Sequence, residues 1–181
     1  MKKALFLDRD GVINQDFGYV HQIDNFEFVP GIFMLCKAAM EHNYIIIVVT
    51  NQAGIGRGFY DEETFLDLTK SISEIFLDND INIAKTYFCP HHPIHGLGKY
   101  KKYCKCRKPE SGMFDKAASE YGIDMKSSIM VGDKLSDLQA AKSAGVGRLV
   151  LFGDSTSELP SNELPFNARS SLVDIIELLV H

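Results

Sequence analysis

Residues 4–13 read ALFLDRDGVI and decide the fold, because a short apolar run stops abruptly at charged residues. A continuous apolar run of this kind is typical of a strand that is covered on both faces, as in a parallel sheet. Comparable runs rich in β-branched residues occupy residues 44–49, 128–131 and 148–152, and a shorter one lies at 86–88. We therefore expect these five segments to form a sheet.

The segments between these runs have helical periodicity, with apolar residues spaced three and four positions apart. This alternation of strands and helices predicts an α/β fold with right-handed crossovers. The chain has 181 residues, 45% of them hydrophobic, which is enough to bury a core in a single domain over residues 1–181. The predicted helices cover residues 31–42, 62–78, 113–121, 136–144 and 171–180.

Three of the apolar runs end in polar residues whose side chains can take part in catalysis or bind a metal ion. Asp8 and Asp10 follow the first run, Thr50 follows the second, and Asp133 follows the third. In an open parallel sheet such positions meet at the carboxyl edge, where ligands bind. Carboxylates suit a hard cation such as Mg2+, and a hydroxyl or a lysine can hold phosphoryl oxygens. An Asp-x-Asp pair alone also suits a solvated turn, but the three strand ends together favour phosphoryl transfer.

Four motifs, in this order, resemble those of the haloacid dehalogenase superfamily of phosphatases. They are DRDGVI at residues 8–13, Thr50-Asn51, Lys108, and GDKLSD at residues 132–137. The resemblance covers nearly the whole chain and implies a Rossmann-like three-layer sandwich with a mainly parallel central sheet. The short spacings between the motifs leave no room for a large cap domain.

This resemblance also implies a role for each motif residue. Asp8 would be the nucleophile that forms an aspartyl-phosphate, and Asp10 would act first as acid and then as base. Thr50, the backbone N–H of Asn51 and the side chain of Lys108 would stabilise the transferring phosphoryl group.

The same motifs imply a Mg2+ site made by Asp8, the backbone carbonyl of Asp10, and Asp133. Asp137 lies four residues after Asp133 at the start of a predicted helix. Two interpretations of Asp137 remain open, since it could support the site from behind or favour the helix dipole.

A cluster of cysteine and histidine residues predicts a second metal site. Cys89, His91, Cys104 and Cys106 form a Cys3His set, which is typical of structural zinc, in a loop over residues 89–108. Because the chain is expected in a reducing compartment, metal binding is favoured over disulfide pairing. The alternative is a reduced loop in which the cysteines are incidental.

The other candidate ligands are less well placed. His91 is favoured over His92 and His95, because the one-residue gap between Cys89 and His91 mirrors the gap between the two later cysteines. Cys36 stands apart on a predicted helix, and we expect it to be a core residue.

Residues 99–108 contain six basic residues and no acidic ones, whereas the whole chain has a net charge of −5. Interleaved basic and aromatic residues are compatible with nucleic-acid binding, but the small patch and the acidic remainder disfavour it. We expect instead that zinc fixes a loop whose downstream end points Arg107 and Lys108 into the phosphate site.

The zinc loop and residues 16–28 resemble one branch of the superfamily, which holds histidinol-phosphate phosphatases and D-glycero-D-manno-heptose-1,7-bisphosphate 7-phosphatases. The long spacer between His91 and Cys104 favours the heptose enzymes. The resemblance implies a substrate loop at residues 14–29, although Phe17 and Tyr19 could simply pack within a hairpin. The implied substrate-binding residues are Asp16, Phe17, Gly18, Tyr19, Asn51, Gln52, Ala53, Arg107 and Lys134.

The function that follows is Mg2+-dependent hydrolysis of the 7-phosphate of a heptose 1,7-bisphosphate, in nucleotide-activated heptose biosynthesis for surface polysaccharide. The alternatives are histidinol-phosphate hydrolysis and a non-enzymatic phospho-aspartate switch. We expect a cytoplasmic monomer that binds a small sugar phosphate and neither nucleic acid nor membrane. No apolar run approaches the roughly 20 residues of a spanning helix, and charges at residues 8–10 interrupt any signal-peptide core.

Overall fold

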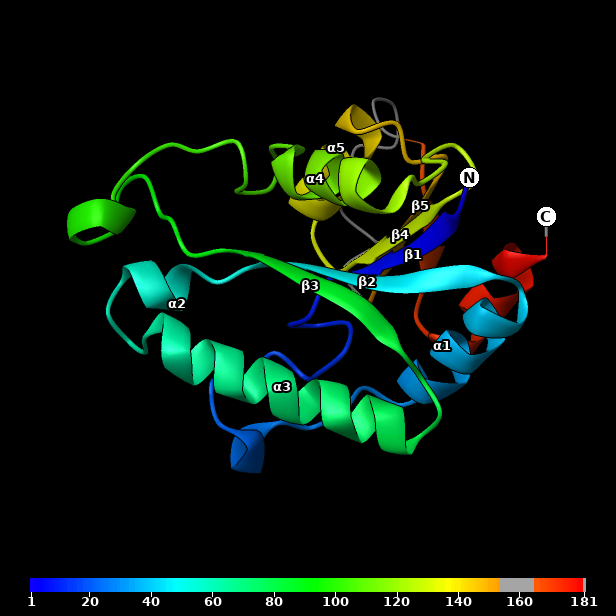
Figure 1. Cartoon of the computed structure of the whole chain (residues 1–181), viewed down its shortest axis with the longest axis horizontal. Coiled ribbons are helices and arrows are strands. Elements are labelled where there is room, and N and C mark those ends of the chain that lie inside the picture. Colours follow the sequence, from blue (N-terminus) through cyan, green and yellow to red (C-terminus); the bar gives the residue numbers. More distant parts are fainter. Residues whose placement is uncertain (154–164, 181) are drawn as a thin grey trace.

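The computed structural model describes residues 1–153 and 165–180, and within them six strands form one sheet (Figure 1). Every neighbouring pair is parallel, and the order is β3-β2-β1-β4-β5-β6. The strands are β1 (Lys3–Leu7), β2 (Tyr44–Asn51), β3 (Ile83–Cys89), β4 (Ile129–Gly132), β5 (Arg148–Phe152) and β6 (Asn167–Arg169).

Strand β1 lies at the centre of the sheet, between β2 and β4. Leu5 pairs with Ile46 on one side and with Ile129 on the other. Residues 4–7 are all fully buried, as a strand covered on both faces requires. The sequence interpretation of residues 4–13 is therefore confirmed.

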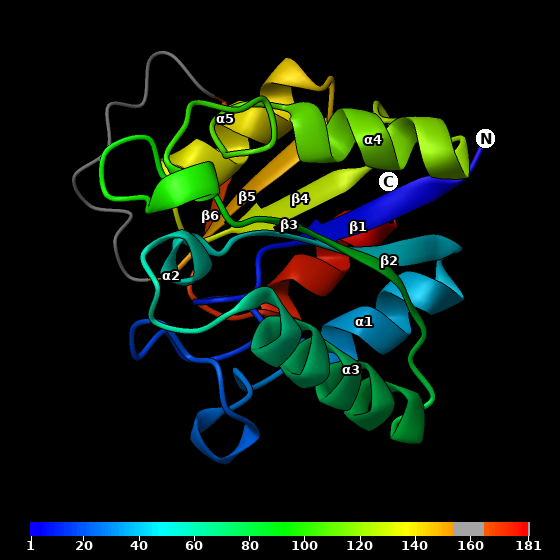
Figure 2. The same ribbon diagram turned by 60° about the vertical axis from the view of Figure 1, so that its left-hand side comes forward.

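Helices cover both faces of the sheet, which makes a three-layer sandwich (Figure 2). The helices are α1 (Ile32–Glu41), α2 (Ala53–Gly56), α3 (Glu62–Asp78), α4 (Gly112–Tyr121) and α5 (Leu135–Ser143), and the 3-10 helices are η1 (Ile23–Asn25), η2 (Gly98–Tyr100) and η4 (Val173–Leu179).

Alternate residues of β1 enter two separate cores. Leu5 and Leu7 belong to a core that contains Leu35 of α1 and Phe76 of α3. Phe6 faces the other way, and its ring centroid lies 5.0 Å from that of Phe114 in α4. The predicted Rossmann-like architecture is confirmed, and the observed sheet is entirely parallel.

Several elements differ from the sequence prediction. The 3-10 helices η1 and η2 were not expected, and β3 is longer than the expected run at residues 86–88. The last helix is a 3-10 helix, η4, rather than an α-helix. Strand β6 was not predicted, because its three residues are largely exposed and include only one apolar residue, Ala168, so that they form no apolar run. The short helix α2 directly follows β2 and was also missed, since four residues cannot show a helical period.

The loop at residues 14–29 is closed by a single antiparallel bridge between Asn14 and Phe28, so it is not a hairpin of two strands. The Gln15 N–H donates to the Glu27 carbonyl at 2.8 Å. A second long loop, residues 90–111, leaves the end of β3 and lies beside α2 (Figure 1). It is tied to α2 by the Leu97 N–H, which donates to the Gly56 carbonyl at 2.7 Å.

Within the described part of the chain, no inserted segment is large enough to form a cap domain. None of the helices in this described part is both long and apolar enough to cross a membrane.

Candidate active site

The ends of β1, β2 and β4 meet at a cavity of about 630 Å3 at the carboxyl edge of the sheet. Parallel strands bring their carboxyl ends together, so residues from distant parts of the chain line one space. The lining residues are Asp8, Asp10, Asp16, Gly18, Tyr19, Asn51, Gln52, Ala53, Tyr60, Arg107, Lys108, Pro109, Lys134, Ser136 and Asp137.

Lys108 is the buried cation of this cavity. Its Nζ lies 3.0 Å from Asp8 Oδ1 and 2.7 Å from Asp137 Oδ1, and it donates to the Val49 carbonyl at 2.8 Å. Burial alone would lower the pKa of Lys108, but the carboxylates of Asp8 and Asp137 outweigh it and raise that pKa. Lys108 is thus held as an ammonium group beside Asp8.

Asp8 is buried, and its contacts leave one oxygen open. The Arg9 N–H and Lys108 Nζ both approach Oδ1, at 2.8 and 3.0 Å. Among the described residues, no group donates to Oδ2. Burial raises the pKa of Asp8, while the neighbouring Lys108 ammonium opposes this shift. The open oxygen of a partly compensated carboxylate can act as a nucleophile or as a metal ligand.

Carboxylate oxygens of Asp8, Asp133 and Asp137 lie within 4.8 Å of one another. Oδ1 of Asp133 is buried and has no hydrogen-bond partner among the residues that the structure describes. Burial, followed by repulsion from Asp8, raises the pKa of Asp133 to about 7. A buried, unpartnered oxygen among crowded carboxylates fits a divalent cation, which would offset their repulsion.

Gly11 allows Asp133 to approach this cluster. A Cβ at position 11 would lie only 2.4 Å from Asp133 Oδ2, and the φ of Gly11 is +89°, where other residues are strained. The glycine of the first motif is therefore required by the position of the Asp133 carboxylate, which directly follows β4.

Asp137 makes two contacts, one for each of its two expected roles, which are to favour the helix start and to support the site from behind. Its Oδ2 accepts from the backbone N–H of Lys134 at 3.1 Å, which caps α5. Its Oδ1 contacts Lys108 Nζ, and the side chain is 2% exposed. Asp137 therefore serves the helix start and also faces the buried cation.

Asp10 is held from three sides. Arg9 donates to both of its oxygens, with the shortest contact at 2.7 Å. Asn14 Nδ2 donates to Oδ1 at 3.1 Å, and Gln52 Nε2 donates to Oδ2 at 2.9 Å. These donors fix a carboxylate that stays partly open to the cavity, with 18% of its side chain exposed.

Loop 14–29 brings Asp16, Gly18 and Tyr19 to the cavity lining. Asp16 Oδ2 lies 3.4 Å from Lys134 Nζ, which in turn lies 3.5 Å from Asp133 Oδ2. Burial opposes the charge of Lys134, but Asp133 and Asp16 raise its pKa. Phe17, also expected at the substrate, is 62% exposed and lies outside this lining.

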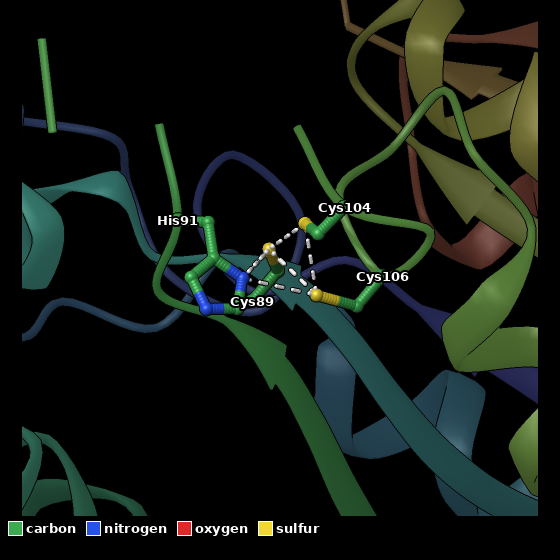
Figure 3. Close-up of side chains that lie close together, drawn as sticks. All are labelled: Cys89, His91, Cys104 and Cys106. Carbon is green, nitrogen blue, oxygen red and sulfur yellow. Dashed lines mark hydrogen bonds between the residues drawn. The ribbon is translucent and has the colours of Figure 1, made fainter. Parts of the chain in front are cut away.

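Cys89, His91, Cys104 and Cys106 converge as predicted (Figure 3). Their sulfur atoms lie 3.0–3.4 Å apart, and His91 Nδ1 lies 3.6 Å from Cys89 Sγ and 3.4 Å from Cys106 Sγ. Three sulfurs and one imidazole nitrogen around a common centre fit a tetrahedral zinc ion.

The remaining candidates are placed elsewhere. His92 Nδ1 accepts from the backbone N–H groups of Ile94 and His95, and His92 is not part of the converging set. Cys36 is fully buried in the core, as expected, and burial raises its pKa to about 12.

Arg107 joins the cysteine cluster to the cavity. It lines the cavity, and its Nη1 donates to the backbone carbonyl of His91 at 3.1 Å. The loop that carries the metal-ligating set therefore also orients this cation.

Three lining residues were missed by the sequence reasoning, namely Tyr60, Pro109 and Ser136. Pro109 and Ser136 lie next to motif residues and could have been included by adjacency. Tyr60 had no such signal, because it reaches the cavity only through the turn between α2 and α3.

Comparison with known proteins identifies close relatives. A family profile described as HAD-hydrolase-like matches residues 105–173. The D-glycero-beta-D-manno-heptose-1,7-bisphosphate 7-phosphatase of Vibrio cholerae is 49% identical over 83% of this chain and 81% of that protein. The corresponding alpha enzyme of Burkholderia mallei is 50% identical over 84% of this chain and 80% of that protein.

A solved structure agrees with these relatives. The D,D-heptose 1,7-bisphosphate phosphatase of B. bronchiseptica, complexed with magnesium and phosphate, superimposes with a TM-score of 0.84. It is 31% identical to this chain, and the match covers 98% of each chain.

Proposed function

This chain belongs to the D-glycero-D-manno-heptose-1,7-bisphosphate 7-phosphatase family of haloacid dehalogenase-like hydrolases, and from that membership we propose that it removes the 7-phosphate of a heptose 1,7-bisphosphate. It is then a phosphoric monoester hydrolase. The observation that carries the proposal is that Asp8, Asp137 and Lys108 line one cavity at the carboxyl edge of the sheet, with Asp133 in the same carboxylate cluster as Asp8 and Asp137.

Residues of this chain supply the first half of the reaction. Oδ2 of Asp8 attacks phosphorus, an O–P bond forms, and the bond to the sugar oxygen breaks to leave an aspartyl-phosphate. Lys108 and the Thr50 hydroxyl stabilise charge on the transferring group. Asp10 gives its proton to the departing sugar oxygen, so the alcohol leaves uncharged.

The second half regenerates the nucleophile. Asp10, now a carboxylate, takes a proton from a water molecule, and that water attacks the phosphorus of the aspartyl-phosphate. The bond between phosphorus and Asp8 breaks, and inorganic phosphate is released. The donors around Asp10 suit this role, because they stabilise the carboxylate that each turn of the reaction uses.

We propose Mg2+ as the cation of the carboxylate cluster, held by Asp8, Asp133 and the backbone carbonyl of Asp10. When bound it offsets the repulsion between an anionic nucleophile and an anionic phosphate. The unpartnered, buried Oδ1 of Asp133 supports this proposal. The related B. bronchiseptica enzyme was crystallised with magnesium and phosphate.

We propose a structural Zn2+ for Cys89, His91, Cys104 and Cys106. A closed set of four protein ligands leaves no position for substrate, so its part is to hold the loop. The contact between Arg107 and the His91 carbonyl then keeps a cation at the substrate cavity.

Substrate recognition falls to two short loops in a single domain over residues 1–181. The first is the substrate loop at about 14–29, with Asp16, Phe17, Gly18 and Tyr19, and the second is the zinc loop at about 89–108, with Arg107. Lys134 and Asp16 face each other across the cavity and suit sugar hydroxyls and phosphate. The remaining proposed substrate-binding residues are Asn51, Gln52 and Ala53.

The setting of the enzyme follows from this substrate. We propose that this chain acts on this small sugar phosphate in the cytoplasm, as a monomer. Its product would feed nucleotide-activated heptose biosynthesis for surface polysaccharide.

A phosphate-release assay tests the proposal. Its substrates are both anomers of heptose 1,7-bisphosphate, fructose 1,6-bisphosphate and histidinol phosphate. Both anomers are needed because relatives named for the alpha and for the beta anomer are about equally similar to this chain. We expect the highest kcat/KM on a heptose bisphosphate and no turnover by Asp8→Asn. Faster cleavage of histidinol phosphate would assign the other branch. An acyl-phosphate that persists without phosphate release would indicate a phospho-aspartate switch.

A further inference from the structure

The turn between α2 and α3 holds a tyrosine that takes no part in the chemistry above. Tyr60 is 9% exposed and lines the same cavity. Its ring stacks on that of His21, with centroids 4.9 Å apart and an angle of 9° between the planes. Its other neighbours in the core include Ile55 and Phe65. The ring is therefore fixed, and with it the direction of the hydroxyl group.

The sequence makes room for this ring at Gly54. A Cβ at position 54 would lie 2.3 Å from Cε1 of Tyr60 and 2.8 Å from its hydroxyl oxygen. The glycine after the second motif is thus matched to the tyrosine six residues later.

The Tyr60 hydroxyl contacts only Gln52 among the described residues. It donates to Gln52 Oε1 at 2.5 Å. Burial raises the pKa of Tyr60 to about 12, so the hydroxyl keeps its proton at neutral pH. Gln52 itself is 2% exposed, and its backbone N–H donates to the Cys89 carbonyl at 2.8 Å.

This bond sets the orientation of the Gln52 amide. With Oε1 turned to Tyr60, Nε2 donates to Asp10 Oδ2 at 2.9 Å and to Thr50 Oγ1 at 2.8 Å. The reversed amide would place Oε1 against the Asp10 carboxylate, where two acceptors repel each other. In this orientation both N–H groups of the Gln52 amide and one lone pair of its Oε1 are engaged, and only the second lone pair of Oε1 is left.

The orientation of the Gln52 amide affects two reacting groups, Asp10 and Thr50. Asp10 is held by Gln52 on the oxygen that Asn14 does not contact. Thr50 accepts a hydrogen bond from Gln52, which leaves its own O–H free to donate toward a phosphoryl oxygen. Gln52 has no donor left for a substrate.

We propose that Tyr60 is a positioning residue for proton transfer, acting through Gln52 on Asp10. The proposal rests on the proposed phosphatase function and reassigns Gln52 from substrate binding to the support of Asp10. It concerns the proton that Asp10 gives to the leaving oxygen, so its effect depends on how much the leaving group needs that proton.

The test is the leaving-group dependence of Tyr60→Phe, which removes only the hydroxyl. kcat/KM covers the steps up to release of the alcohol. We expect a drop of about tenfold in kcat/KM on the heptose bisphosphate, whose alkoxide needs protonation. We expect a drop within about twofold on p-nitrophenyl phosphate, whose phenolate leaves without a proton. Equal drops on both substrates would overturn the proposal.

Two further variants distinguish an effect of Tyr60 that acts through Gln52 on Asp10 from a general loss of activity. Tyr121→Phe is the matched control, since its hydroxyl bonds the Ala84 carbonyl away from the cavity, and it should keep full activity. Gln52→Leu should show the same selective drop, and adding Tyr60→Phe to it should cost nothing more. Additive losses in the double variant would contradict a path through Gln52.

A measurement without substrate keeps the proposal testable if a variant folds poorly. In the wild type, the side-chain NH2 protons of Gln52 should exchange slowly with water in NMR spectra, with the signals assigned by their loss in Gln52→Leu. Fast exchange in the wild type would overturn the proposal. A wild type that cleaves other alkyl phosphates but no heptose bisphosphate would contradict the proposed substrate alone, because the leaving-group comparison can then be made on fructose 1,6-bisphosphate.

Discussion

Asn51 and Lys108, which are 57 residues apart in the sequence, are joined by two reciprocal hydrogen bonds. Asn51 Nδ2 donates to the Lys108 carbonyl at 3.1 Å, and the Lys108 N–H donates to Asn51 Oδ1 at 3.0 Å. The side chain at the end of β2 thus fixes the backbone from which the buried ammonium group reaches Asp8.

Asn51→Ala should therefore weaken both folding and catalysis. We expect a loss of about 1–3 kcal/mol in the free energy of unfolding, from two hydrogen bonds at a partly buried site. We also expect at least about a tenfold fall in kcat, because Lys108 loses its fixed origin. Denaturant unfolding and phosphate release measure the two effects. Asn79→Ala, which removes an amide at the far end of α3, should leave kcat unchanged; full activity in Asn51→Ala would refute this account.

The two contacts of Asp137 can be separated by two substitutions. Asp137→Asn keeps an acceptor for the Lys134 N–H but removes the charge that faces Lys108. We expect it to lower kcat about tenfold or more while α5 stays capped. Asp137→Ala removes both contacts and should cost about 1 kcal/mol more in stability. Full activity in the Asn variant would mean that Asp137 serves only the helix.

The stability of the metal-free protein should depend on pH through Asp133. Its folded-state pKa is raised to about 7 by burial and by Asp8, above the ordinary value of 3.8. Between these two values the folded chain binds a proton that the unfolded chain has lost, so stability falls as the pH rises through this window and then levels off.

Added Mg2+ should reverse this trend, because the cation binds ionised carboxylates. We expect Mg2+ to raise Tm more at about pH 8 than at about pH 5, measured against a chelator-treated sample. Asp133→Asn should reduce the dependence on both pH and Mg2+. An equal Mg2+ effect at the two pH values would contradict the cation site.

Removal of one cysteine ligand should disorder the loop that carries Arg107. Cys106→Ser is expected to abolish stoichiometric zinc binding and to raise KM for the heptose bisphosphate, since Arg107 loses its support at His91. Cys36→Ala is the matched control, because Cys36 lies in the core, and it should keep one zinc per chain. Elemental analysis that finds no zinc in the wild type, purified without chelator, would rule out the zinc site.

Residues next to the apolar runs could be predicted from the sequence, because parallel strands must bring their carboxyl ends together. Asp8 and Asp133, predicted in this way, lie in one carboxylate cluster, and Thr50 contacts Gln52, which in turn contacts Asp10. The cysteine cluster followed from its ligand types. Strand β6 could not be predicted, since its three residues form no apolar run and their place in the sheet comes from pairing with β5.

Contacts between side chains that are far apart in the sequence could not be predicted from it. The pairing of Asn51 with Lys108, and of Tyr60 with Gln52, depends on how loops fold back over the sheet edge, and no local pattern encodes it. Phe17 stays a prediction: it is 62% exposed and lies outside the cavity lining, to which its neighbours Gly18 and Tyr19 belong.

The central claim is that this chain removes the phosphate at carbon 7 of a heptose 1,7-bisphosphate, and 31P NMR of the reaction tests it most directly. We predict that the signal of the 7-phosphate is replaced by inorganic phosphate while the 1-phosphate signal persists, and that Asp8→Asn leaves both signals unchanged. Loss of the 1-phosphate instead, or turnover by the Asp8→Asn variant, would contradict the account.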